Sequence, residues 1–336
     1  MSEAFSSSSL PVPRLVSLFS LVAPKLARVE CEIERNLRSD LGPIHEAGTY
    51  LSGGGGKLIR PSLLLLVAGM LGYEGDQDVN LGAVFELIHT ATLVHDDIID
   101  EADTRRGRPA LNRIIGNEMS ILQGDYLYIR SMNMALFARK IRVIDLLAES
   151  TERMIEGEIM AHHIRGRSDV TAEQHMEIIR RKTAWLFSGC CRVAGVLADV
   201  ELEREHRLGR YGMELGIAFQ LVDDLLDLTA DEATLGKPVA SDLREGRLTL
   251  PWIDLMACGS EQNRRDIASV LEDGSFERCS YQSLHDALEH HGCLARCQER
   301  AERHADNARE ALRGFAGGAH RDVLGELPDM VLRRDR

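Results

Sequence analysis

The chain has 336 residues, of which 44% are hydrophobic, so it is long enough to bury a large core as one big domain or two modest ones. Its formal net charge of -13 argues against nucleic acid as a partner, because proteins that bind nucleic acid usually present basic surfaces. No apolar run reaches the roughly 18 residues that a membrane helix needs, so no integral membrane segment is predicted. These properties predict a soluble globular protein. They leave anionic substrates open, because local cations and metal ions can reverse the local field.

The N-terminal 15 residues, MSEAFSSSSLPVPRL, lack the basic segment and the apolar core of a signal peptide. We therefore interpret residues 1–15 as a disordered lead-in and residues 16–336 as one domain, and we expect a cytoplasmic protein. The seven cysteines are scattered and odd in number, which indicates reduced thiols. A zinc site in HHGCLARC, residues 290–297, is disfavoured against ordinary helix, because Gly292 interrupts the segment and no second ligand pair has a recognisable spacing.

Apolar residues recur at spacings of three and four along most of the chain, which predicts helices. Alternating runs are scarce, only nine prolines interrupt the chain, and neither a strand nor a repeat is predicted. The long predicted helices cover residues 79–99, 120–137, 143–163, 171–198 and 203–228. From about Gly259 onward the chain is richer in charge, histidine and glycine, which indicates peripheral helices, and the final RRDR is expected to be solvated. The pattern predicts an all-α fold in a single domain.

The first segment with a chemical signature is LSGGGGKLIRP, residues 51–61, in which four glycines precede Lys57 and Arg60. It is not a nucleotide P-loop, because Leu51 stands at the place of the leading glycine and Leu58 at the place of the hydroxyl that holds magnesium. Glycines still allow the backbone to approach a ligand closely, and cationic side chains beside them suit a phosphate. A flexible loop with solvated charges is an equal alternative for this segment by itself.

Three aspartates follow in ELIHTATLVHDDIIDEADTRRG, within an apolar predicted helix. Asp96 and Asp100 share one helix face, whereas Asp97 lies about 100° round the axis. Two carboxylates on one face repel each other, so the arrangement favours a bound cation. Oxygen ligands without histidine or cysteine suit Mg²⁺.

A second aspartate motif, FQLVDDLLD, places Asp223, Asp224 and Asp227 at the same spacing. A solvated face would be an equal alternative for one such motif, but both are embedded in apolar helix. Basic residues follow each motif, namely Arg105 and Arg106 after the first and Lys237 after the second. The pair of motifs therefore predicts a site for a multiply charged phosphate ligand held through metal.

Six segments that occur in order between Gly54 and Pro251, over roughly three fifths of the chain, make a pattern that resembles the trans-isoprenyl diphosphate synthases, in particular the long-chain, octaprenyl-type members. They are GGKLIRP, ELIHTATLVHDDIIDEADTRRGRP, GDYL, RKTAWLF, FQLVDDLLD and GKPVASDLREGRLTLP. The resemblance implies an all-α bundle around a deep central cavity, usually a homodimer. It also implies a Mg²⁺-dependent, head-to-tail condensation of a farnesyl- or geranylgeranyl-type allylic diphosphate with isopentenyl diphosphate. Three Mg²⁺ ions with substrate bound, and a peripheral membrane contact for product release, belong to the same expectation.

The resemblance also implies roles for individual residues. Direct metal ligands would be Asp96, Asp100 and Asp223, while auxiliary positions that bind waters or basic partners would be Asp97, Asp224 and Asp227. The allylic diphosphate would contact Arg105, Lys182, Thr183, Gln220 and Lys237. Isopentenyl diphosphate would contact Lys57, Arg60, His89 and Arg106. Phe219 is interpreted as core with at most a wall contact, Arg247 stands where some members carry lysine, and the adjacent His162 and His163 receive no role.

Product length in this family is read from the positions just before the first aspartate motif. Ala91 and Thr92 lie about one helical turn before Asp96, and short-chain members carry aromatic residues there. A methyl and a hydroxyl group at these positions predict that the tail passes them and continues past Ile88. Its further path would run toward Phe85, or toward Met132 and Met134 of a neighbouring helix. A product of the octaprenyl class is expected.

Three alternatives remain at this stage. A medium-chain, geranylgeranyl-type synthase differs only in product length. A class I terpene cyclase usually replaces the second aspartate motif by an Asn/Ser/Glu motif and needs no isopentenyl site, so both DDLLD and the loop with Lys57 and Arg60 disfavour it. A noncatalytic regulatory subunit should have lost aspartates, and none is missing.

Overall fold

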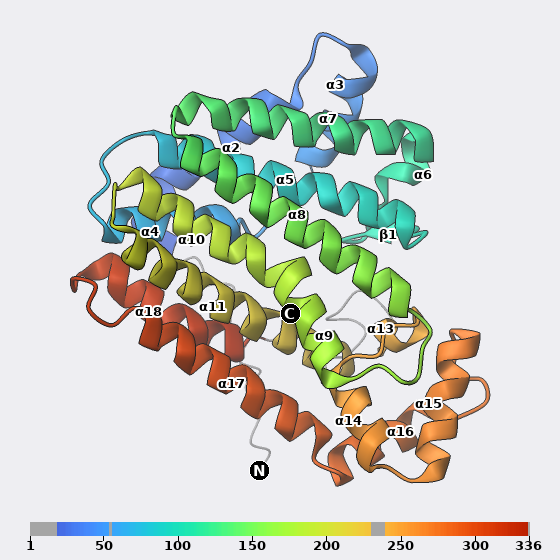
Figure 1. The fold of residues 1–336 in the computed structure, drawn as a ribbon. Coiled ribbons are helices and arrows are strands. Elements are labelled where there is room, and N and C mark those ends of the chain that lie inside the picture. Colours follow the sequence, from blue (N-terminus) through green and yellow to red (C-terminus); the bar gives the residue numbers. More distant parts are fainter. Residues whose placement is uncertain (1–18, 54–55, 230–238, 335–336) are drawn as a thin grey trace, which may run out of the picture.

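The computed structural model describes residues 19–53, 56–229 and 239–334, and these form a bundle of helices (Figure 1). The first half contains η1 (Phe19–Val22), α2 (Ala23–Leu37), α3 (Gly42–Ser52), α4 (Ile59–Met70), α5 (Gln77–Ile99), α6 (Leu111–Ile115), α7 (Asn117–Ala135), η2 (Leu136–Ala138) and α8 (Ile141–Ile164). The second half contains α9 (Ala172–Ile179), η3 (Arg180–Ala184), α10 (Trp185–Leu197), α11 (Leu202–Thr229), α13 (Ser241–Arg244), α14 (Leu250–Cys258), α15 (Glu261–Asp273), α16 (Tyr281–His290), α17 (Cys293–Ala311) and α18 (Ala319–Leu332). The predicted all-α class is confirmed.

The core lies around α4, α5, α10 and α11. Residues 63–68 of α4 are all buried, and α5 and α10 are apolar around much of their circumference, as expected of helices surrounded by others. α5 packs on α2, α4 and α7, while α10 packs on α4, α8 and α11. α5 and α11 both end on the same side of the bundle, so the two aspartate motifs at their C-terminal ends come together (Figure 1).

The predicted helix over residues 171–198 contains a π-helical turn, η3, between α9 and α10. This turn carries Lys182 and Thr183 and packs against Gly157 of α8. A Cβ at Gly157 would lie only 2.5 Å from the backbone nitrogen of Lys182, so the close approach requires glycine. The extra residue of a π turn leaves the apolar pattern nearly continuous, which is why the sequence predicted one uninterrupted helix; such turns are frequent at functional sites.

The expectation of no strand is wrong at one place. β1 (Thr104–Arg105) and β2 (Arg108–Pro109) form a two-stranded antiparallel hairpin directly after α5. Its turn residues, Arg106 and Gly107, have φ values of 52° and 72°, the left-handed conformation that tight hairpin turns require. Strands of two residues are too short to produce an alternating pattern, so sequence periodicity misses them.

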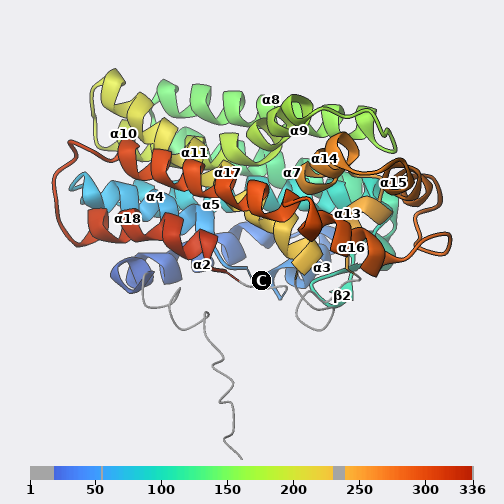
Figure 2. The same ribbon diagram turned by 90° about the horizontal axis from the view of Figure 1, so that it is seen from below.

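The expectation for the C-terminal third is only partly right. α15 and α16 lie at the edge of the molecule, but α17 lies along α11, and α18 packs on α4 and α17 (Figures 1 and 2). The inward stripe of α17 consists of small, fully buried side chains, namely Cys297, Ala301, Ala305 and Ala308. Because the rest of α17 is strongly charged, this narrow stripe was hidden within a composition typical of a peripheral helix.

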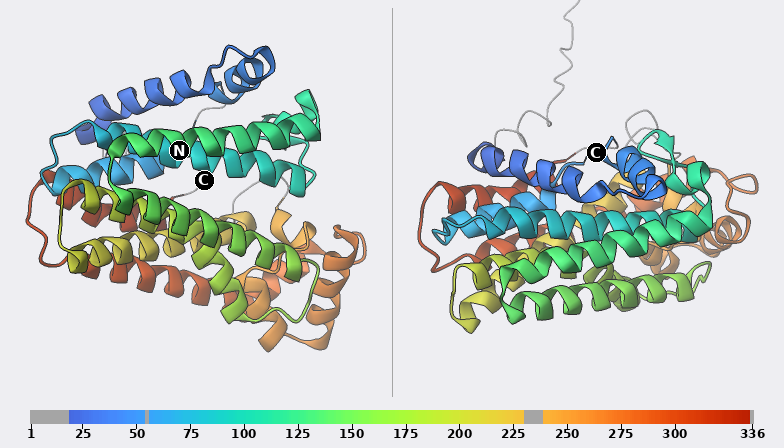
Figure 3. Two further views of the ribbon diagram at one scale, coloured as in Figure 1. Left: turned by 45° about the horizontal axis from the view of Figure 1, so that its top comes forward. Right: turned by 90° about the horizontal axis from the view of Figure 1, so that it is seen from above.

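The outer layer formed by α7 and α8 exposes many large apolar side chains. The two helices run side by side along the outside of the bundle (Figure 3). Their exposed large apolar side chains include Met119, Ile121, Leu122 and Ile129 on α7, and Ile155 and Ile159 on α8. All seven cysteines carry free thiols, and no helix of the described residues is long and apolar enough to cross a membrane.

Candidate active site

Both aspartate motifs open into one cavity of about 990 Å³. Its walls come from the loop before α4 and from α5, α8, η3 and α11. Asp96 enters it from α5 and Asp223 from α11, although 127 residues separate them in the chain. A smaller adjoining cavity of about 270 Å³ is also lined by Asp96, together with Asp100 and Asp224. Asp96 therefore lies where the two spaces meet.

Asp96 is held close to cations in a largely buried position. Its side chain is 18% exposed, and the Nζ atom of Lys182 lies 3.8 Å from its Oδ2 atom. Lys182 also pairs with Glu158 of α8, which lines the same cavity. Burial raises the pKa of Asp96 to about 6, although Lys182 opposes this shift. Such a carboxylate is poised to gain from a divalent cation, which would offset the cost of its buried charge.

The other two aspartates of the first motif follow the helix-face argument. Asp97 turns away from the main cavity toward the hairpin and accepts a hydrogen bond of 2.7 Å from Arg105 Nε. Asp100 lines the small cavity, where Arg165 Nη1 lies 3.0 Å from Oδ1 and Arg247 Nη1 lies 3.4 Å from Oδ2. Asp97 thus anchors the hairpin, while Asp96 and Asp100 face the two cavities.

The second motif divides differently, because Asp223 and Asp224 line the two cavities and Asp227 lines neither. Asp223 faces the main cavity and pairs with Arg334. Asp224 is buried, and its carboxylate contacts His175 Nε2 at 2.8 Å and accepts from Gln220 Nε2 at 3.1 Å. Asp227 is also buried and accepts hydrogen bonds from Ser241 Oγ at 2.6 Å and from the backbone nitrogen of Asp242 at 3.0 Å. Asp227 therefore ties α11 to α13.

The residues expected to contact an allylic diphosphate surround Asp96. Lys182, Thr183 and Gln220 line both cavities, and Thr183 Oγ1 donates a hydrogen bond of 2.9 Å to Gln220 Oε1. Arg105 also lines both cavities while it holds Asp97. Lys237 lies outside the described residues.

The residues expected to contact isopentenyl diphosphate form a second cationic group in the main cavity, lined by Lys57, Arg60, His89 and Arg106. Burial and the neighbouring arginines hold the pKa of His89 well below its usual range, so its imidazole is neutral. Arg60 stacks over the ring of Phe187 at 5.2 Å, and its buried Nε atom has no acceptor among the described residues. A buried guanidinium with an unused donor suits an anionic ligand.

Gly56, the last glycine of the opening loop, lies against this cationic group. A Cβ at this position would lie 3.4 Å from Glu86 Oε1 and 3.7 Å from Arg106 Nη1. Glu86 faces Arg60 and Arg106, and its buried Oε2 atom has no hydrogen-bond partner within residues 19–53, 56–229 and 239–334. Gly56 therefore lies beside cations at the wall of the cavity.

The residues expected along the path of the product tail differ in whether they line the cavity. Thr92 lines the cavity, but Ala91 and Ile88 do not, because both are buried in the hydrophobic core. Phe85, Met132 and Met134 do not line the cavity either; Phe85 and Met134 are buried in the core, and Met132 packs against it. Below Asp96 the apolar wall instead comes from α8, through Met154, Ile155 and Ile159. Ala91 precedes Thr92 by one residue, about 100° round the axis, and so faces packed side chains.

Several site residues were missed from the sequence. Glu158 pairs with Lys182, Arg165 with Asp100, His175 with Asp224, and Arg334 with Asp223. The expectation that the final RRDR is solvated is wrong for Arg334, whose side chain is 11% exposed. Glu158 and Arg165 flank the His162 and His163 pair, which is exposed at the end of α8 and lines neither cavity.

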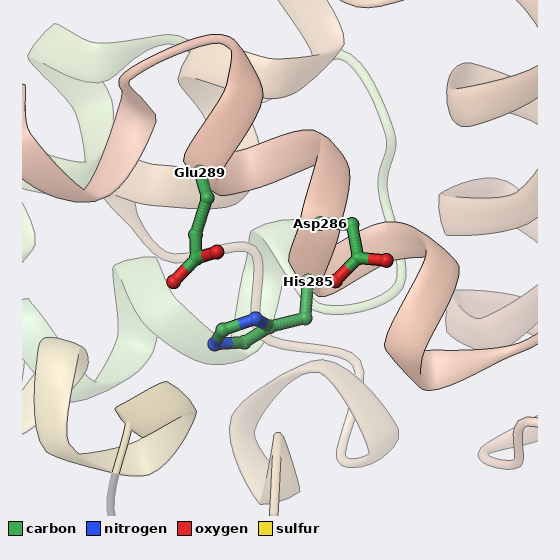
Figure 4. Close-up of side chains that lie close together, drawn as sticks. All are labelled: His285, Asp286 and Glu289. Atoms are coloured by element: carbon green, nitrogen blue, oxygen red, sulfur yellow. The ribbon is translucent and has the colours of Figure 1, made fainter.

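One further group could hold a metal ion by proximity. His285, Asp286 and Glu289 lie together on α16 at the edge of the molecule (Figure 4). All three come from one helical turn, and two of them are exposed. Exposed acidic groups of this kind are common without a metal, so the cluster carries no functional conclusion. The disfavoured zinc ligands nearby include Cys293 and Cys297, which are fully buried.

A helical bundle in which two aspartate motifs and two cationic groups share one cavity defines an enzyme class that acts on diphosphate esters. A family model described as polyprenyl synthetase matches residues 43–287. The chain is 38% identical over 322 residues to octaprenyl diphosphate synthase of Escherichia coli (strain K12), covering 96% of this chain and 99% of that protein. The chain therefore belongs to the polyprenyl synthetase family, and it is a trans-prenyltransferase.

Solved structures agree with this assignment. A decaprenyl diphosphate synthase from Rhodobacter capsulatus superposes with a TM-score of 0.89 at 36% identity, covering 97% of this chain and 100% of that one. A polyprenyl synthase from Caulobacter crescentus CB15, complexed with calcium and isoprenyl diphosphate, gives a TM-score of 0.90 at 31% identity, covering 98% and 100%.

Proposed function

We propose that the protein condenses a farnesyl- or geranylgeranyl-type allylic diphosphate with isopentenyl diphosphate, head to tail and in trans, into a long-chain polyprenyl diphosphate. The observation that carries this proposal is the pairing of two separate cationic groups within one cavity. One group surrounds Asp96 and suits the departing diphosphate, and the other includes Arg60 and suits a second diphosphate that stays intact. Similarity to an octaprenyl and a decaprenyl diphosphate synthase supports a long product.

The donor set at the aspartate motifs fits Mg²⁺. Asp96 and Asp100 of one helix and Asp223 of another offer only carboxylate oxygens, the ligands that this ion prefers. We propose these three residues as its ligands, with Asp97, Asp224 and Asp227 positioning the two helices. When bound, the metal would neutralise charge on the departing diphosphate. The expected number of three ions stays a prediction.

The remaining residues would bind, orient and exclude water. Lys182, Thr183 and Gln220 would hold the allylic diphosphate beside Asp96, while the cationic group around Arg60 would hold isopentenyl diphosphate. Because His89 is neutral, it would contact the second diphosphate as a hydrogen-bonding group and not as a charge. The apolar wall from α8 would keep water from the reacting carbons.

Incubation of the purified protein with farnesyl diphosphate, radiolabelled isopentenyl diphosphate and Mg²⁺ tests this function. We expect a ladder of polyprenyl diphosphates whose main product is long. A main product of geranylgeranyl length would contradict the long-chain part of the proposal. A hydrocarbon would indicate a cyclase, and absence of turnover until a partner is added would indicate a regulatory subunit.

Product length gives a residue-level prediction. Thr92→Phe should shorten the main product by several isoprene units, because the ring would fill the cavity one turn below Asp96. Thr92→Ser is the matched control, since it keeps the hydroxyl that donates to His89 O at 2.8 Å and should leave the ladder unchanged. Thin-layer analysis of the dephosphorylated products measures the effect. An unaltered ladder from Thr92→Phe would place the tail elsewhere.

We also propose a homodimer built on α7 and α8. Seven large apolar side chains on these helices are exposed in the single chain, more than isolated surface residues would explain. Ile155 and Ile159 belong to this face and also line the cavity, so a second copy would close the cavity on that side. A monomeric mass in light scattering would refute the dimer. The cytoplasmic location and the membrane contact during product release stay predictions.

A further inference from the structure

The last described residue of the chain enters the active-site cavity. α18 ends at Leu332, and two residues later the guanidinium of Arg334 pairs with Asp223 Oδ1. Its Nη2 atom also donates to the carbonyl oxygen of Phe219 at 2.9 Å, and its Cζ atom lies 3.8 Å above the Phe219 ring. Both contacted residues lie on one turn of α11. The guanidinium of Arg334 is therefore held directly at the second aspartate motif.

The carboxylate that Arg334 contacts is the one that the proposed metal would need. Asp224 and Asp227 are occupied by hydrogen bonds from His175, Gln220 and Ser241, whereas Asp223 faces the main cavity. The Asp223 side chain is 42% exposed and faces the cavity, and the permanently charged Arg334 supplies its counter-charge. A metal ion and Arg334 would therefore compete for the same carboxylate.

We propose that Arg334 occupies the place of the metal at Asp223. In the metal-free enzyme Arg334 binds this carboxylate, and Arg334 must leave when the metal binds. The inference rests on the proposed metal-binding role of Asp223. The stack on Phe219 holds the guanidinium on α11, and its buried Nε atom meets no acceptor in the part of the chain that the structure describes. Because one donor is unsatisfied, the arginine gives up an incomplete set of hydrogen bonds when it leaves.

An ordered loading of the site follows from this competition. A metal ion arriving alone must displace Arg334 and leave two cations beside each other in the cavity. A metal ion arriving with a diphosphate brings negative oxygens to which the released guanidinium can bind. Metal binding at the second motif is therefore weak in the free enzyme and strengthened by the diphosphate, with Arg334 as the residue that couples the two.

Metal affinity of the substrate-free protein tests the proposal without reference to turnover. Binding of Mn²⁺, measured by electron paramagnetic resonance, should tighten by about tenfold in Arg334→Gln, because apparent affinity scales with the fraction of molecules whose site is free. Arg333→Gln is the matched control, since Arg333 is exposed one residue earlier and should bind Mn²⁺ like the wild type. Arg334→Lys, which keeps the charge without the planar fork, should give an intermediate affinity.

Adding inorganic diphosphate should narrow the difference in Mn²⁺ affinity between the wild type and Arg334→Gln, because both proteins then bind the metal together with the diphosphate. Equal Mn²⁺ affinity of the wild type and Arg334→Gln, with weaker binding by Asp223→Asn, would overturn the role of Arg334 while leaving the metal role of Asp223 intact. If Asp223→Asn bound Mn²⁺ as the wild type does, Asp223 would not be a ligand and both statements would fail. Thermal melting of each variant shows whether it folds. If Arg334→Gln does not fold, the Mn²⁺ affinity of Arg334→Lys is compared with that of the wild type in its place.

Discussion

Replacing Asp96 by asparagine is expected to lower kcat by roughly 10³- to 10⁵-fold, because a bound metal supplies several kcal/mol of charge stabilisation and each 1.36 kcal/mol is a factor of ten. Among the aspartates that the structure describes, Asp96 alone lines both the main cavity and the adjoining small cavity. Asparagine has nearly the same shape but carries no charge for the metal. Steady-state condensation of the two diphosphates measures the loss.

Asp103→Asn is the control for this experiment. Asp103 lies seven residues further along, its side chain is 83% exposed, and it pairs with Arg113 outside both cavities. Its substitution should leave kcat within about twofold, as expected for a surface ion pair. A loss of less than tenfold in Asp96→Asn would show that Asp96 is not a metal ligand.

The same substitution should stabilise the metal-free protein at neutral pH. Burial raises the pKa of Asp96 from 3.8 to about 6, so between these pH values the folded state keeps a proton that the unfolded state has lost. This carboxyl therefore favours folding most below about pH 4, and its contribution falls as the pH rises to about 6, by about 3 kcal/mol. Asparagine has no charge to bury and avoids that loss.

The free energy of unfolding should thus be nearly equal in wild type and Asp96→Asn at pH 4, and should differ by about 3 kcal/mol in favour of the variant at pH 7. Urea titrations with a chelator present, at both pH values, measure the two differences. The difference in the free energy of unfolding between the variant and the wild type cancels the contribution of other titrating groups. A difference independent of pH would show that Asp96 keeps an ordinary pKa.

Lys57→Ala should raise the KM for isopentenyl diphosphate by roughly 10- to 150-fold, because one charge-assisted hydrogen bond contributes about 1.5–3 kcal/mol. The KM for the allylic diphosphate should change by less than about threefold, since Lys57 lies in the cationic group around Arg60 and Arg106. Initial rates with each substrate varied in turn separate the two constants.

Lys140→Ala is a suitable comparison, because Lys140 pairs with Asp199 and lines neither cavity of the active site. It should leave both KM values unchanged. Equal increases of both constants in Lys57→Ala would assign Lys57 to the allylic site or to the fold, and the opening glycine-rich loop would lose its proposed partner.

Much of the fold follows from local physics that a sequence displays. The 3.6-residue period predicts the long helices, and it also separates Asp96 and Asp100 from Asp97, which is the division between the cavities and the hairpin seen in the structure. The family resemblance predicts that the second aspartate motif and the loop at Lys57 line the same cavity as the first motif. These features depend on residues close in sequence, or on motifs with strong spacing.

The features missed from the sequence depend on contacts between distant segments. The π turn at Lys182 is recognisable only when Gly157 of α8 is placed against it. The buried position of α17 rests on a narrow alanine stripe, such as Ala301 and Ala305, within a charged helix. Arg334 reads as a solvated terminal charge until α18 is packed on α4 and the chain end reaches Asp223.

The hairpin between α5 and α6 has a consequence for how the two substrates are spaced. Arg105 and Arg106 are neighbours in the chain, yet Arg105 bonds to Asp97 and lines both cavities, whereas Arg106 lines the main cavity from the turn beside Gly56. Adjacent Cα atoms are about 3.8 Å apart, so the hairpin holds the two arginines at neighbouring positions on the cavity wall. Under the proposed binding of the two substrates, each diphosphate would meet one of these arginines, and a turn longer by one residue would shift one arginine relative to the other.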